Sequence, residues 1–175
     1  FALTALPAVA APTAEQKAQI AAFAGGSKVR IARCDVSDAS ALKTLTDELL
    51  QARVPLRGVF HAAGVLDDGA LDGQNLARYA KVAAAKSDAA WRLSQQTWEA
   101  QLDFFVLFSS ASAAFGSPGQ ANYSASNAFL DGMAAWRRFH GKMATSIAWG
   151  AWDEVGMAAK LDDRTRARWA RAGVG

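Results

Sequence analysis

Apolar and polar positions along the chain fall into short runs that are typical of two kinds of element. Strands are predicted where apolar residues, many of them β-branched or aromatic, form brief runs between turn residues. The run at 103–109 is apolar almost throughout, as expected of a strand buried on both faces. The other predicted strands lie at 1–4, 28–33, 58–63 and 144–149.

Between these strands the pattern is typical of helices. Thr13 and Gln16 fit a capping box that begins an alanine-rich helix, which ends at Gly25. Ser37 or Asp38 caps the next helix, in which several leucines share one face. Further helices are predicted at about 76–100, at about 122–140 and, with a basic composition, at 163–172.

The alternation of strands and helices predicts the fold class. Strands separated by helices of this length indicate parallel β-α-β units and a Rossmann-like, doubly wound α/β sheet. Ligands of such sheets bind beyond the carboxyl ends of the strands. We therefore expect residues 62–64, 109–112 and 149–152 to line one crevice.

Composition narrows the possible functions. A length of 175 residues favours one domain, and 51% hydrophobic against 20% charged residues excludes a disordered chain. The one cysteine, Cys34, excludes an internal disulfide and a metal site built from several thiolates, and no metal site is predicted. No apolar run is long enough to span a membrane. The net charge of +3 is scattered, which argues against nucleic-acid binding.

The main candidate for chemistry is the segment 123–127 at the start of a predicted helix. Its first and last residues, Tyr123 and Asn127, are four apart and share one face of that helix. Ser110 ends the preceding strand, so its hydroxyl is expected beside the phenol. A phenol with a pKa near 10 transfers protons poorly at neutral pH unless a cation stabilises its ionised form, and Lys86 is a candidate for that cation. Taken singly, these residues also have ordinary structural interpretations: helix packing, a strand-end cap and a solvated lysine.

Together, these four residues resemble the catalytic tetrad of ketoreductase domains from type I modular polyketide synthases, within the short-chain dehydrogenase/reductase superfamily. Ordinary members carry Tyr-x-x-x-Lys, whereas this branch has Asn four residues after Tyr and its Lys on the preceding helix, as this chain does. Further agreement comes from residues 34–36, 55–71, 102–131 and 145–158.

The resemblance implies reduction of the 3-keto group of an acyl chain held by an acyl carrier protein, with NADPH as the hydride donor. Tyr123 would protonate the developing alkoxide, and Ser110 would hydrogen-bond the same oxygen. Lys86 would lower the pKa of Tyr123 and bind the nicotinamide ribose, while Asn127 would hold this arrangement or a relay water. The resemblance also implies neighbouring synthase domains as partners and a cytoplasmic location.

The resemblance also implies a cofactor-binding set along the crevice. Asp35 and Val36 would lie by the adenine. Ala62, Ala63 and Gly64 would lie by the ribose. Trp149, Gly150 and Ala151 would flank the nicotinamide. The arginine expected to pair with the 2′-phosphate is not identifiable, so the choice of NADPH over NADH rests on the resemblance alone.

Asp68 closes the motif Leu66-Asp67-Asp68, which in this family marks B-type ketoreductases that form the D-oriented 3-hydroxyl. The opposite type carries tryptophan eight residues before the catalytic tyrosine, where this chain has Phe115. An ordinary solvated turn is the alternative interpretation of the two aspartates. His61, Cys34 and the helical tryptophans Trp91, Trp98 and Trp136 are assigned to packing.

The sequence departs from the family at its ends. It contains no G-x-G-x-x-G, so we interpret residues 1–175 as a partial catalytic domain, truncated at both ends: the first strand and phosphate-binding loop lie upstream and a last strand lies downstream. Loss of a central strand exposes unpaired strand edges, so the chain alone is expected to be unstable or inactive.

Two other functions stay open at this stage: the ketoreductase of a multifunctional fatty-acid synthase, and a non-catalytic Rossmann-like scaffold domain of a megasynthase. The surviving tetrad argues against the scaffold. A basic surface that includes Arg164, Arg166, Arg168 and Arg171 is a candidate contact for an acidic carrier protein, but a solvated helix face is the favoured interpretation.

Overall fold

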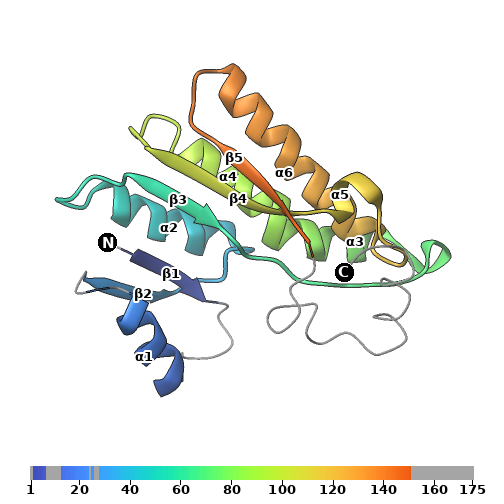
Figure 1. Cartoon of the computed structure of the whole chain (residues 1–175), viewed down its shortest axis with the longest axis horizontal. Coiled ribbons are helices and arrows are strands. Elements are labelled where there is room, and N and C mark those ends of the chain that lie inside the picture. Colours follow the sequence, from blue (N-terminus) through green and yellow to red (C-terminus); the bar gives the residue numbers. More distant parts are fainter. Residues whose placement is uncertain (1, 7–12, 24, 26–27, 151–175) are drawn as a thin grey trace.

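The computed structural model describes residues 2–6, 13–23, 25 and 28–150 (Figure 1). Within them, strands and helices alternate, and every strand pairing is parallel, so the predicted α/β class is confirmed. The strands are β1 (Ala2–Leu6), β2 (Val29–Arg33), β3 (Gly58–His61), β4 (Phe104–Ser110) and β5 (Thr145–Trp149).

The helices follow the predicted order with one interruption. They are α1 (Ala14–Phe23), α2 (Ala39–Leu50), η1 (Leu71–Gly73), α3 (Leu76–Ala83), η2 (Ala84–Asp88), α4 (Ala89–Gln96), α5 (Ser112–Phe115) and α6 (Ala121–Phe139). The long helix expected at 76–100 is therefore α3 and α4 joined by the π-turn η2, which holds Lys86. π-Turns inside helices are frequent at functional sites.

Local capping accounts for where two helices begin. Thr13 and Gln16 form the predicted reciprocal box, with Gln16 N–H donating to Thr13 Oγ1 and Thr13 N–H donating to Gln16 Oε1. Of the two candidates for the cap of α2, the structure selects Asp38, whose carboxylate accepts from the backbone N–H groups of Ser40 and Ala41.

The strands form two sheets rather than one: β1 pairs with β2, and β3, β4 and β5 pair in that order. Among the described residues, the second edge of β1 and the second edge of β3 have no strand partner. Phe60 on β3 is 65% exposed.

The core lies on one face of the three-stranded sheet, between β4 and the helices α4 and α6 (Figure 1). Phe105 and Leu107 point to this face and pack against Leu130 and Met133 of α6. The prediction that β4 is buried on both faces is wrong for the described residues, because Phe104 on the opposite face is 41% exposed and its neighbours there are only half-buried. No described helix covers that face.

A smaller cluster connects the two sheets. Cys34, which follows β2, packs with Leu42 and Leu45 of α2 and with Ala89 of α4. Burial raises the pKa of the Cys34 thiol, in keeping with the predicted packing role. This cluster holds the segment after β2 against α4, the helix that directly follows the π-turn with Lys86.

Candidate active site

The site forms where β4 and β5 end and α6 begins. Ser110 pairs with Trp149 in the sheet, and the next residue, Ala111, donates its N–H to the Trp149 carbonyl at 2.9 Å. Tyr123 lies in the first turn of α6 and Asn127 one turn later, and both side chains are buried. The Asn127 Nδ2 donates to the Tyr123 carbonyl at 2.9 Å, which fixes the amide beside the tyrosine.

Lys86 reaches the same place from the π-turn η2. Its side chain is buried at 3% exposure, and its Nζ lies 5.2 Å from the centroid of the Tyr123 ring. Nζ also donates to the Phe108 carbonyl of β4 at 2.9 Å. Burial lowers the pKa of Lys86 from 10.5 to about 8, so the ammonium is still mostly protonated at neutral pH.

The pKa of Tyr123 differs from the expectation drawn from the sequence. Burial raises it above its ordinary value of 10, the nearby Asp68 carboxylate raises it further, and hydrogen bonding to Asn127 and Ser110 acts in the opposite direction. The net shift is upward because desolvation of the phenol outweighs these two hydrogen bonds, and the lowering that we expected from Lys86 is not found. Tyr123 is held as the protonated phenol, the form that donates a proton.

His61 has the predicted packing role, and it also makes a contact that the sequence analysis did not anticipate. It is buried at the end of β3, and its Nε2 lies 2.8 Å from the backbone carbonyl of Lys86, so the ring must donate there. Burial lowers the pKa of His61 to about 4, which leaves the ring neutral. The sequence signal for this contact was the presence of a polar residue, His61, at the end of an apolar strand.

Several features near the ends of β3, β4 and β5 fit a dinucleotide. The backbone passes close to the Lys86 ammonium at Gly64, where a Cβ would lie 3.5 Å from Nζ. The Asn127 Oδ1 is buried and has no hydrogen-bond partner within the described residues, so it can accept from a bound group. Ala62 and Ala63 lead from β3 to Gly64, on the same edge.

The remaining cofactor candidates divide into three cases. Asp35 follows β2, and its carboxylate accepts from the backbone and hydroxyl of Ser37. Val36 packs against the Cys34 cluster instead of standing free. Trp149 and Gly150 lie at the end of β5, whereas Ala151 falls outside the described residues, as do Trp152 and the predicted basic helix with Arg164, Arg166, Arg168 and Arg171.

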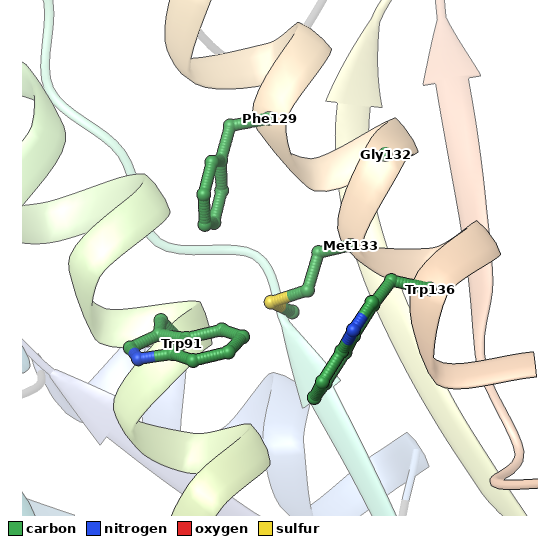
Figure 2. A pocket seen from close by; sticks show the side chains of 5 residues that line it. All are labelled: Trp91, Phe129, Gly132, Met133 and Trp136. Carbon is green, nitrogen blue, oxygen red and sulfur yellow. The ribbon is translucent and has the colours of Figure 1, made fainter. Parts of the chain in front are cut away.

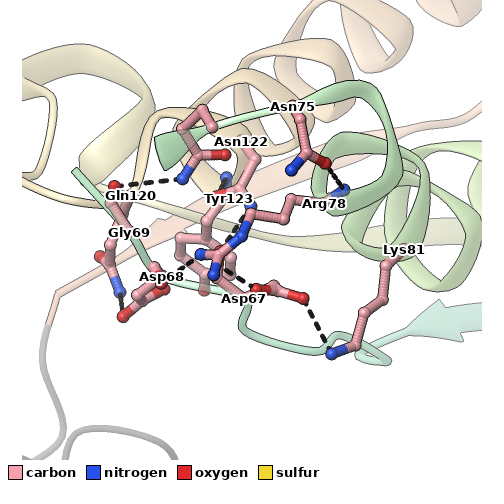
Figure 3. Close-up of polar contacts among 10 residues, drawn as sticks. Asp67, Asp68, Gly69, Asn75, Arg78, Lys81, Gln120, Asn122 and Tyr123 are labelled. Atoms are coloured by element: carbon pink, nitrogen blue, oxygen red, sulfur yellow. Dashed lines mark hydrogen bonds and ion pairs between the residues drawn. The ribbon is translucent and has the colours of Figure 1, made fainter. Parts of the chain in front are cut away.

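Asp68 is exposed, as the alternative of a solvated turn predicts, but its carboxylate has a hydrogen-bond partner. Its Oδ2 accepts from the side-chain amide of Gln120 at 2.9 Å, next to the start of α6 (Figure 3). Asp67 is joined to Arg78 and Lys81 of α3 by ion pairs. Phe115, at the position where the opposite stereochemical type carries tryptophan, is exposed.

Away from the tetrad, an open groove of about 330 Å³ lies between α4 and α6, lined by Trp91, Phe129, Gly132, Met133 and Trp136 (Figure 2). Trp91 and Trp98 each contact the Trp136 ring, with centroids 5.2 and 5.1 Å apart. The predicted packing role of these tryptophans therefore holds, and Trp136 is also partly exposed.

Within the described ranges, no group of three or more acidic, histidine or cysteine side chains is arranged to hold a metal ion. None of the helices described is both long and apolar enough to cross a bilayer.

Comparison with known proteins gives the family. The model of the KR domain family matches residues 2–154. The chain is 47% identical over 164 residues to a phenolphthiocerol synthesis type I polyketide synthase of Mycobacterium tuberculosis, whose name includes the word inactive; the match covers 92% of this chain and 10% of that protein. It is 47% identical over 155 residues to polyketide synthase GfsA of Streptomyces halstedii, covering 86% of this chain and 2% of that protein.

Among solved structures, the chain is similar to A-type ketoreductases from a modular polyketide synthase, with a TM-score of 0.83 and 42% identity over 97% of this chain and 36% of that chain. The chain thus spans about a third of that ketoreductase and a tenth or less of these two synthases. The shared sequence, fold and strand-end site lead to one conclusion: this chain belongs to the KR domain family, the ketoreductases of type I polyketide synthases.

Proposed function

We propose that this chain carries the catalytic residues for NADPH-dependent reduction of the 3-keto group of a polyketide intermediate bound to an acyl carrier protein. The observation that supports this most directly is the convergence of Lys86, Ser110, Tyr123 and Asn127 at one strand-end crevice, with Lys86 Nζ 5.2 Å from the Tyr123 ring. When bound, the dinucleotide supplies a hydride for the carbonyl carbon.

Two side chains of the chain, Ser110 and Tyr123, act on the ketone oxygen. The Ser110 hydroxyl donates a hydrogen bond to the ketone oxygen, and Tyr123 transfers its proton to that oxygen as negative charge develops. A hydroxyl is thereby formed and a phenolate remains on Tyr123. The raised pKa of Tyr123 keeps the acid form ready. The phenolate that remains faces the Lys86 ammonium, whose Nζ lies 5.2 Å from the ring centroid, and takes up its next proton from solvent.

The cofactor would be held by the residues that line the crevice. Lys86 would donate to the nicotinamide ribose, and Ala62, Ala63 and Gly64 would let the ribose approach the backbone closely. Asp35 and Val36 would lie by the adenine, and Trp149, Gly150 and Ala151 would flank the nicotinamide. The preference for NADPH over NADH belongs to this proposal and is tested by comparing the Kd of the two.

Substitution of the proposed acid is the decisive experiment. In the protein that contains this chain, Tyr123→Phe should lower kcat for a 3-ketoacyl thioester by about 100-fold or more, because the proton donor is lost, while the Kd for NADPH stays unchanged. Tyr79→Phe, which changes the other tyrosine of the chain, on α3, is the matched control and should keep wild-type kcat. Comparable kcat in Tyr123→Phe and wild type would show that the assigned acid is wrong.

The proposed stereochemistry is B-type, giving the D-oriented hydroxyl. Asp68 in Leu66-Asp67-Asp68 and Phe115 in place of tryptophan support it. The similarity to A-type ketoreductases that are 42% identical to this chain points the other way. Chiral chromatography of the reduced product decides: the D-hydroxyl supports the proposal, and the L-hydroxyl replaces it with the A-type assignment.

A non-catalytic scaffold is the second candidate, favoured by the word inactive in the name of one relative. It predicts no reduction by the wild-type protein under any cofactor condition. The intact tetrad argues against it, since a scaffold has no need to keep a buried ammonium next to a buried phenol, an arrangement that costs stability.

We also propose that the catalytic domain is completed by a further strand between β1 and β3, whose facing edges have no partner in the part of the chain that the structure describes. The carrier protein and neighbouring synthase domains are the proposed partners. The cytoplasmic location expected from the resemblance stays a prediction.

A further inference from the structure

The segment that carries Asp68 is fastened to the start of the helix that carries Tyr123. Gly69 N–H donates to the Gly119 carbonyl at 2.8 Å, and Gln120 Nε2 donates to Asp68 Oδ2 at 2.9 Å. Asn122, which is fully buried, donates from Nδ2 to the Asp67 carbonyl at 2.8 Å. Residues 67–69 therefore lie against the start of α6, next to Tyr123, and we call this segment the wall.

Arg78 holds this wall from the other side (Figure 3). Its Nη1 donates to the Asp68 carbonyl at 2.7 Å and lies 3.3 Å from Asp67 Oδ1. Asn75 caps α3 by accepting from Arg78 N–H, which fixes Arg78 in the first turn. A Cβ at Gly69 would overlap the Arg78 guanidinium, so a larger residue there would require the end of the Arg78 side chain to shift.

Charge gives a reason for an arginine at this position. Asp67 and Asp68 are adjacent carboxylates, and their repulsion favours a spread or solvated loop. Arg78 and Lys81 both pair with Asp67, but among the described side chains only Arg78 also binds the backbone of Asp68. A guanidinium can bind a carboxylate and a carbonyl at the same time, whereas an ammonium is a point charge.

The wall matters because a ketone has two faces. With its oxygen held by Ser110 and Tyr123, a 3-ketoacyl chain can lie in two orientations that exchange the substituents of the carbonyl carbon. A fixed obstacle or polar contact on one side is needed to separate them. The Asp68–Gln120 pair lies on one side of Tyr123, and its position depends on how the loop is held.

We propose that Arg78 is a positioning residue for the substrate: by fixing the Asp68–Gln120 pair beside Tyr123, it determines which face of the ketone is reduced. This inference rests on the proposed reductase function. Arg78 itself contacts neither the reacting atoms nor the tetrad; it acts through residues 67–69.

The test uses Arg78→Gln, Arg78→Lys and Arg57→Gln in the full protein that contains this chain. Arg57 pairs with Asp103 ahead of β3 and β4, at the opposite end of the sheet, so its variant controls for loss of an arginine–aspartate pair. Arg78→Gln should lower the ratio of the two hydroxyl epimers by at least tenfold and raise KM several-fold. Its kcat and its Kd for NADPH should stay within about threefold of wild type. Arg78→Lys should restore part of the ratio, and Arg57→Gln should match wild type.

Hydrogen exchange supplies a readout that does not depend on activity. In Arg78→Gln, the amide of Gly69 and its neighbours should exchange at least tenfold faster, while the amides of α6 keep their protection. An unchanged epimer ratio in Arg78→Gln would overturn the inference, as would loss of protection throughout α6, which marks a merely structural role. Failure of the wild-type protein to reduce any ketoacyl thioester would overturn the proposed function and this inference together.

Discussion

His61 is uncharged at neutral pH, because burial lowers its pKa from 6.5 to about 4. The ring donates to the Lys86 carbonyl in the π-turn and so helps to hold the backbone from which the ammonium projects. A phenylalanine of similar shape would leave that carbonyl without its donor. We therefore expect the position to accept asparagine, which donates without titrating, better than phenylalanine.

Stability should depend on pH through this residue. The unfolded chain takes up a proton near pH 6.5, whereas the folded chain keeps the ring neutral down to about pH 4. The contribution to stability is thus fully present above pH 6.5 and is lost as pH falls toward 4, at a cost of about 3 kcal/mol. Denaturant titrations of wild type between pH 4 and 7 measure this loss.

His61→Asn should make that part of the pH profile shallower, because the variant has no ring to protonate. His140→Asn is the matched control for loss of an imidazole, since His140 is the other histidine of the chain and lies exposed at the end of α6. Identical profiles in wild type and His61→Asn would mean that the ring does not titrate differently on folding.

At the scale of elements, a buried cation joins α6 to its neighbours. Arg137 is 1% exposed and has no carboxylate partner in the described part of the chain. Its Nη1 donates to Ser94 Oγ of α4 at 2.7 Å and its Nε to the Met143 carbonyl at 3.2 Å. The guanidinium also lies over the Phe105 ring of β4, 4.1 Å from its centroid.

Removing this cation should loosen the packing of α6 without changing the chemistry. We expect Arg137→Met to lower the free energy of unfolding by about 2–4 kcal/mol, because the carbonyls of Ser94 and Met143 and the Ser94 hydroxyl lose their donor. Arg138→Gln, which changes the exposed neighbour that donates only to the Ala144 carbonyl, should cost less than about 1 kcal/mol. Urea denaturation measures the free energy of unfolding of both variants. Equal values for Arg137→Met and wild type would contradict the proposed role of Arg137 in packing α6.

At the scale of the whole molecule, the divided sheet is the main structural weakness. β1–β2 and β3–β4–β5 share no strand pairing, and the small cluster around Cys34 connects them. Open strand edges and a half-covered face of β4 favour association or local unfolding. The four tetrad residues nevertheless all lie on the larger sheet and the helices next to it.

Residues 1–175 produced alone should therefore unfold with low cooperativity, bind a hydrophobic dye and reduce no ketoacyl thioester. Calorimetry, dye fluorescence and an NADPH-oxidation assay measure the three properties. The control is a longer polypeptide of the same protein that supplies a strand able to pair with β1 and β3. Stable, monomeric reduction by residues 1–175 would contradict the prediction.

The sequence by itself determined most of the elements and the candidate residues for chemistry. A continuous apolar run located β4 and a capping pattern located the start of α1. Residue type and spacing, together with the family resemblance, selected Lys86, Ser110, Tyr123 and Asn127. These features were accessible because side-chain direction repeats with the local backbone geometry, and local geometry depends on neighbours in sequence.

Tertiary structure alone decided the environment of those residues. The raised pKa of Tyr123, the His61 contact with Lys86 and the Arg78 contact with Asp68 depend on burial or on segments brought together from different elements. The single covered face of β4 likewise depends on which helices pack there. Desolvation and long-range contacts arise from packing of the folded chain, and no local pattern of residues encodes them one by one.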